Sequence, residues 1–121
     1  MAIIGYMEGT DSALLSKLVV LGHETLPLGN GWDNHGKYIR HITQSDGINL
    51  IVGYLHKFVP TKSTNLTPAD MLLQFKTIGI PIVVLVTEEY LVKAKDTLSS
   101  AADFAQVMSP QMAFDKVAEM V

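Results

Sequence analysis

The sequence predicts an α/β fold in which a parallel β-sheet lies between two layers of helices. Two apolar runs, INLIVGYL at 48–55 and IPIVVLV at 80–86, lack the alternation of polar and apolar residues that a half-exposed strand shows. Unbroken apolar runs of this kind are typical of central strands covered on both faces. Helical patterns follow the strand-like runs, and each β-α unit has the length that a right-handed crossover needs. With 121 residues, the chain is expected to form a single domain over residues 1–121.

The chain begins with a predicted strand and a predicted helix. Residues 2–7, AIIGYM, are rich in β-favouring side chains and predict the strand. The leucines and valines of LLSKLVVLG, residues 14–22, recur with helical spacing. Thr10 or Asp11 is placed to cap this helix by accepting hydrogen bonds from its first free N–H groups.

A short strand and a short helix are predicted next. ETLPL, residues 24–28, predicts the strand, and because Pro27 has no N–H to donate to a ladder, we expect this strand at an edge of the sheet. After a stretch rich in glycine and asparagine, Tyr38, Ile39 and Ile42 predict a short amphipathic helix.

The second half of the chain contains clear helix starts. A hydroxyl cap followed by proline occurs at Thr67–Pro68 and at Ser109–Pro110, and each pair predicts the beginning of a helix. Thr87 is placed to cap the helix between them. FAQVM, residues 104–108, predicts the last strand and is polar enough for a sheet edge.

The five predicted β-α units indicate a three-layer α/β/α sandwich with a five-stranded parallel sheet. The two unbroken apolar runs belong inside the sheet and the strand with proline belongs outside. This placement fits the strand order 2-1-3-4-5, which is the flavodoxin-like arrangement.

Composition excludes several functional classes. The net charge is −3 with nine Lys and Arg residues scattered along the chain, so no basic surface for nucleic acid or an anionic membrane is expected. The absence of cysteine excludes disulfides and thiolate chemistry. The apolar runs are too short to cross a bilayer. We therefore expect a soluble, cytoplasmic protein, and its high apolar content makes a homodimer plausible.

The fold predicts where a site should lie. In this topology a crevice forms outside the carboxyl ends of strands 1 and 3, because the chain leaves them toward opposite faces of the sheet. Functional residues are therefore expected in the loops after the first three strands. The expected ligand-binding residues are Glu8, Thr10, Ser12, Asn30, Trp32, Asn34, Lys57, Thr64 and Asn65. The candidate catalytic residues are His56, His35 and Asp11.

The loop after strand 3, HKFVPTKSTNLT at 56–67, is the most informative of these loops. It is longer than the two to six residues that a connection requires, and it is rich in side chains that can donate to an anion. A solvated surface excursion is the alternative interpretation. His56 leaves a central strand at the crevice, where an imidazole can act as a general acid or base.

The stretch GNGWDNHGKY, residues 29–38, contains G-x-x-x-x-G-K from Gly31 to Lys37, the beginning of a phosphate-binding loop. Tyr38 stands where that loop has a serine or threonine for magnesium, so a turn-rich connection is the preferred interpretation. No two of the four histidines have a tight ligand spacing such as H-x-x-x-H, and no metal site is predicted. The sequence identifies no cofactor.

These observations lead to two functional hypotheses. The first is a small domain that binds an anionic small molecule or a partner protein over the ends of strands 1 to 3. The alternative is an enzyme, a lyase, hydrolase or transferase, in which His56 or His35 carries a proton on a small phosphorylated or carboxylated substrate and Asp11 or Asp33 orients the imidazole.

Overall fold

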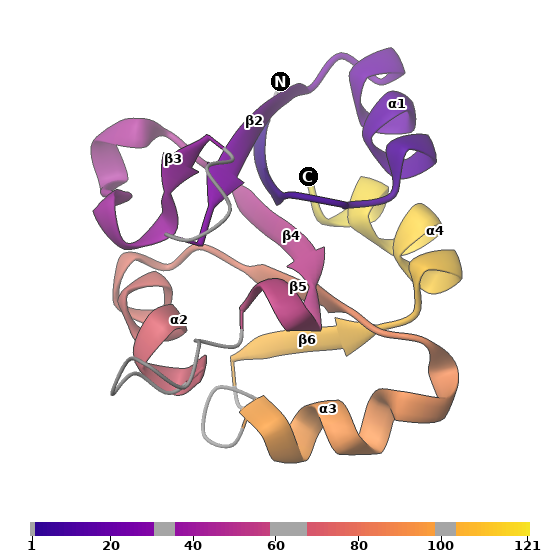
Figure 1. Cartoon of the computed structure of the whole chain (residues 1–121). Coiled ribbons are helices and arrows are strands. Elements are labelled where there is room, and N and C mark those ends of the chain that lie inside the picture. The colour runs from indigo at the N-terminus through magenta and orange to yellow at the C-terminus, as the bar shows by residue number, and fades with distance from the viewer. Residues whose placement is uncertain (1, 31–35, 59–67, 99–103) are drawn as a thin grey trace.

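The computed structural model describes residues 2–30, 36–58, 68–98 and 104–121. These residues form an α/β fold around one parallel sheet of six strands, in the order β3-β2-β1-β4-β5-β6 (Figure 1). The strands are β1 (Ile3–Met7), β2 (Glu24–Gly29), β3 (Lys37–Tyr38), β4 (Leu50–Tyr54), β5 (Ile82–Leu85) and β6 (Ala105–Met108).

In these described segments, four α-helices and four short 3-10 helices accompany the strands. The α-helices are α1 (Ser12–Val20), α2 (Pro68–Ile78), α3 (Leu91–Leu98) and α4 (Pro110–Met120). The 3-10 helices are η1 (Ile39–His41), η2 (Gln44–Asp46), η3 (Leu55–Lys57) and η4 (Glu88–Tyr90). None of the helices in these described segments has the length and apolar character that a membrane span requires.

Helices cover both faces of the sheet. On one face α1 and α4 pack together, and Leu14, Leu18 and Val117 meet Ile4 and Val52 of the strands. Figure 1 shows these two helices on the same side of the sheet. The other face carries α2, α3 and η1, whose buried side chains meet the alternate residues of the same strands. Successive residues of a strand point to opposite faces, so each strand contributes to both cores.

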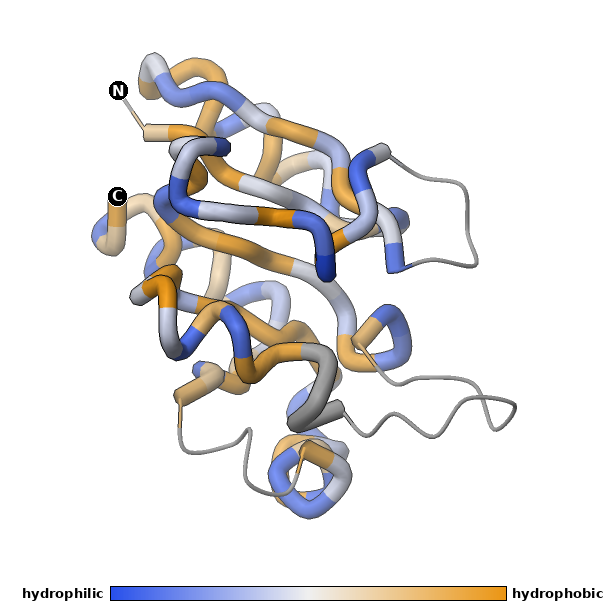
Figure 2. Tube along the Cα trace, turned by 90° about the vertical axis from the view of Figure 1, so that its left-hand side faces the viewer, coloured by the Kyte–Doolittle hydropathy of each residue, from blue (hydrophilic) through white to orange (hydrophobic). Residues whose placement is uncertain are grey.

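The two unbroken apolar runs form the inner strands, as predicted. β4 lies between β1 and β5, and β5 lies between β4 and β6. All four residues of β5 and the first four of β4 are buried. Figure 2 shows this concentration of hydrophobic residues along the strands, with hydrophilic residues on the outer turns. Burial on both faces is the reason why these segments show no alternation.

Two predicted caps are confirmed. The side chain of Asp11 accepts a hydrogen bond from Ala13 N at 3.0 Å at the start of α1. Ser109 accepts one from Met112 N at 3.2 Å at the start of α4, where Pro110 occupies the first helical position. Each side chain satisfies a backbone donor that the first turn of a helix leaves without a partner.

The sheet has six strands rather than the predicted five, and 24–28 is not an edge strand. The segment from Tyr38 to Ile42, predicted as a helix, forms β3 and η1 instead. β3 pairs with Leu28 and Gly29 only, so its ladder starts just beyond Pro27. Gly36 turns the chain with φ 68°, and a Cβ there would collide with the Pro27 carbonyl. Proline excludes a hydrogen bond at its own position, but it does not exclude pairing one residue later.

Candidate functional site

The ends of β1 and β4 lie side by side at the rim where the sequence predicts a crevice. These strands are parallel neighbours with Tyr6 opposite Val52, so the residues that follow them lie at the same rim of the sheet. From β1 the chain passes to α1 on one face, and from β4 it passes to α2 on the other. Ligands of open α/β sheets commonly bind where consecutive connections diverge in this way.

Three expected binding residues meet at this rim. Lys57 Nζ lies 3.7 Å from Glu8 Oε1, and the Lys57 side chain is only 17% exposed. Asn30, which is fully buried directly after β2, donates its side-chain amide to the Lys57 carbonyl oxygen at 3.3 Å. The ends of β1, β2 and β4 are therefore connected by the ion pair between Glu8 and Lys57 and by the hydrogen bond from Asn30 to the Lys57 carbonyl oxygen.

The turn that carries His56 and Lys57 is anchored by Phe58. This side chain is fully buried, and its backbone N–H donates to the Leu55 carbonyl oxygen at 2.9 Å. Gly53 makes room for the ring, because a Cβ at that position would lie 3.1 Å from Phe58 Cζ. The glycine and the phenyl ring together hold the exit of β4 against the sheet.

The start of α1 is less suited to a ligand than the sequence predicts. The Thr10 hydroxyl donates to the Met7 carbonyl oxygen at 2.7 Å, and the Asp11 carboxylate accepts from Ala13 N. The carboxylate of Asp11 thus occupies the positive end of the helix, where it would repel an anion. Ser12 is exposed and faces a different hollow, of about 460 Å³, beside Val19 and Val20.

His56 lies apart from Asp11. Its ring is exposed and stacks with Tyr54, with ring centroids 6.2 Å apart and an angle of 28° between the planes. Asp11 instead borders a hollow of about 290 Å³ with Pro110, Gln111 and Phe114. Among the residues that the structure describes, no carboxylate lies within ion-pair distance of His56.

Several expected site residues lie outside the described residues. They are His35, Trp32, Asn34, Thr64 and Asn65, together with Asp33. The last residue of the G-x-x-x-x-G-K stretch, Lys37, is described. It lies in a strand rather than at a helix start, and its ammonium group pairs with Asp46 at 2.6 Å. The helix that a phosphate-binding loop requires after its lysine is therefore replaced by β3 and η1.

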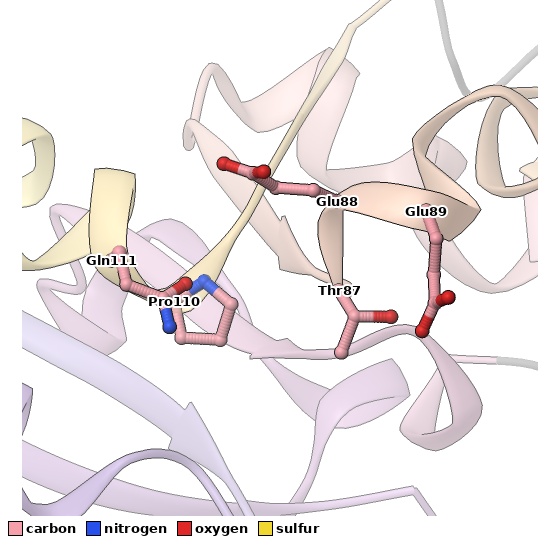
Figure 3. Close-up of a pocket in the computed structure, with 5 residues that line it drawn as sticks. All are labelled: Thr87, Glu88, Glu89, Pro110 and Gln111. Atoms are coloured by element: carbon pink, nitrogen blue, oxygen red, sulfur yellow. The ribbon is translucent and has the colours of Figure 1, made fainter.

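Sequence reasoning missed a hollow of about 510 Å³ at this rim. Figure 3 shows Thr87, Glu88 and Glu89 on one side of it and Pro110 and Gln111 on the other. These residues follow β5 and β6, and we interpreted them only as helix starts. Since all strands are parallel, the exits of β5 and β6 share the rim with those of β1 and β4. The predicted parallel arrangement of the strands could therefore have indicated that Thr87, Glu88, Glu89, Pro110 and Gln111 share the rim of the candidate site.

The charges of the rim are separated along the sheet. Glu88, Glu89 and Asp11 border the hollows beside α4, whereas Lys57 stands at the β1 and β4 exits. Within the described segments, no group of three or more His, Cys, Asp or Glu side chains is arranged to hold a metal ion. Among the described residues, the rim therefore presents the partly buried ion pair of Lys57 and Glu8 beside a half that carries Asp11, Glu88 and Glu89.

Comparison with known proteins identifies no relative. No family model matches the chain, and no curated protein or solved structure shows significant similarity to it.

Proposed function

We propose that this protein is a binding domain that takes an anionic small molecule at the carboxyl ends of β1, β2 and β4. The five longer strands follow one another as β2-β1-β4-β5-β6, and we take this as a flavodoxin-like order to which β3 adds an edge. In that arrangement the β1 and β4 exits are the topological switch point.

The observation that carries the proposal is the position of Lys57. Its side chain is only 17% exposed, its ammonium group lies 3.7 Å from the Glu8 carboxylate, and its backbone carbonyl oxygen accepts a hydrogen bond from Asn30. Electrostatic attraction is stronger where water is partly excluded, so a phosphate or carboxylate is attracted more strongly there than at an exposed lysine. The acids beside α4 repel an anion and so confine it to this half of the rim.

Glu8 has a defined part in this proposal. Its carboxylate lies 3.7 Å from the ammonium group and competes with an incoming anion for the same charge. Because the Lys57 side chain is only 17% exposed, a ligand must displace Glu8 from a pair that is stronger than a fully exposed one, and removal of Glu8 should therefore favour the ligand. The two expected residues at the start of α1, Thr10 and Asp11, are engaged in local hydrogen bonds and have no part in it.

The enzyme hypothesis has weaker support. It requires a carboxylate that orients the imidazole of His56, and the described residues supply none within ion-pair distance. We therefore place His56 beside the ligand as a contact and not as a proton carrier.

The test is a titration with inorganic phosphate at constant ionic strength, followed by backbone amide NMR shifts. We expect saturable shifts at residues 8, 30 and 57. Lys57→Gln should weaken binding at least tenfold, and Glu8→Gln should strengthen it severalfold by removing the competing charge. Lys93→Gln, an exposed lysine on α3, is the control and should have no effect. Absence of saturable shifts, or equal affinity of the Lys57→Gln variant, would refute the proposal.

A further inference from the structure

We infer that the ligand of this site carries a planar aromatic group, which lies in a hollow between Tyr54, His56 and Tyr90. This inference rests on the proposed anion site and extends it, because it specifies the second half of the ligand. The hollow lies at the carboxyl ends of β4 and β5, and β4 is the strand that Lys57 follows.

The walls of the hollow are aromatic. Tyr54 ends β4, and its ring is stacked with that of His56 at 6.2 Å. Tyr90 ends η4 and is 52% exposed, which is high for a large apolar ring. Aromatic rings attract other rings through offset and edge contacts at centroid distances of about 4.5–7 Å. Three such side chains around one hollow therefore favour a planar ring over an aliphatic group.

The floor and the charge of the hollow agree with that choice. Leu85 and Val86 line its base and are buried. Among the described residues that line it, none is a lysine, arginine, aspartate or glutamate. An uncharged apolar floor with aromatic sides suits the ring of a ligand and not its anionic group, which belongs at Lys57.

The size of the hollow limits what enters it. Its volume is about 230 Å³. An apolar cavity of about 150 Å³ is enough for benzene, whereas pockets that enclose a whole ligand are usually about 300–1,000 Å³. The hollow thus accepts one ring system, and the remainder of the ligand extends outside it.

The direction of that remainder follows from the sheet. The hollow lies at the ends of β4 and β5. Lys57 pairs with Glu8, which directly follows β1 in the chain. Neighbouring strands are about 4.8 Å apart, so the ring and the anionic group are separated by about 5–10 Å. An aromatic ring joined to a phosphate or carboxylate over that distance describes the class of ligand.

Three probes test the two halves separately. Adenosine 5′-monophosphate carries both a ring and an anion, ribose 5-phosphate carries only the anion, and adenosine carries only the ring. We expect the monophosphate to bind at least tenfold more tightly than either fragment, with shifts of the Tyr54 and Tyr90 ring resonances. Tyr90→Leu should reduce its affinity to that of ribose 5-phosphate and leave ribose 5-phosphate unaffected. His56→Ala should act in the same direction.

Phe114→Leu is the matched control, because Phe114 is an exposed aromatic residue on α4 and lies away from this hollow. Circular dichroism verifies that each variant is folded. Equal affinity for the monophosphate and ribose 5-phosphate would refute the aromatic hollow but not the anion site. An unchanged affinity of Tyr90→Leu for the monophosphate would do the same. Adenosine binding that requires Tyr90, without ribose 5-phosphate binding, would support the hollow and refute the anion site. No binding of any probe at about 5 mM would overturn both.

Discussion

Gly53 provides the most direct test of how closely β1 and β4 approach each other below the site. A Cβ at Gly53 would lie 2.5 Å from Met7 Cγ, 2.7 Å from Met7 Cβ and 3.1 Å from Phe58 Cζ. Carbon atoms in contact are normally about 3.5–4.0 Å apart, so the shortfall is about 1 Å. Met7 Cβ is attached directly to the backbone of β1, and no rotamer change can move it away.

The two opposing effects of Gly53→Ala can be weighed. Overpacking of a buried site costs about 1–3 kcal/mol. Alanine also reduces the freedom of the unfolded chain, which stabilises the protein by about 0.4–1 kcal/mol. Because the first effect is larger, we expect a net loss of about 1–2 kcal/mol in the free energy of unfolding.

Gly5→Ala is the matched comparison for this substitution. Its Cβ would meet Leu28 Cδ1, the tip of a side chain, with Leu28 Cγ at 3.2 Å. A rotamer shift of such a tip costs about 0.5–1.5 kcal/mol, which the unfolded-state effect nearly offsets. Urea unfolding of both variants measures the difference, and Gly53→Ala should be the more destabilising by about 1 kcal/mol. A neutral or stabilising Gly53→Ala would show that the close approach of Met7 and Phe58 is wrong.

Four further substitutions, one of them a control, test other parts of the fold by urea unfolding. The pKa of Asp46 is lowered, mainly by its hydrogen bond from Lys37. The stabilisation that the Asp46 carboxylate provides is therefore complete above the ordinary carboxyl pKa. It is lost as the pH falls through the lowered pKa of the folded state. Asp46→Asn should therefore destabilise the protein at neutral pH, and its difference from the unsubstituted protein should shrink as the pH falls below the ordinary carboxyl pKa, whereas a pH-independent loss would contradict this. Ser109→Ala should cost about 1 kcal/mol through the lost cap of α4, and unchanged stability would remove that role. Phe75→Ala should lower the free energy of unfolding by about 3–5 kcal/mol, because this α2 side chain is fully buried. Leu73→Ala is the control, and because Leu73 is 55% exposed its effect should stay within about 0.5 kcal/mol. Similar losses at both positions would contradict the packing of α2.

The rim of the site was predictable, but its details were not. Glu8, Asn30 and Lys57 each follow a strand-like run, and parallel strands bring their carboxyl ends to one edge, so their common location follows from the sequence. The pairing of Lys57 with Glu8 does not, because 49 residues separate them and only the register of β1 and β4 decides their distance. The hollow at Tyr54 and Tyr90 likewise depends on the pairing of β4 with β5.

The signals that succeeded are local ones. The apolar runs of the inner strands and the caps at Asp11 and Ser109 are each contained within a few residues, because a hydrogen-bonded turn or an unbroken apolar run is complete within that span. The sequence by itself therefore determined the five longer strands, the α-helices of the described segments, and which two strands are buried on both faces. Only the tertiary structure decided that residues 37–38 join β2 as a sixth strand and that Asp11 and His56 lie in different hollows. Those outcomes depend on how distant segments meet in space, and no local pattern encodes that.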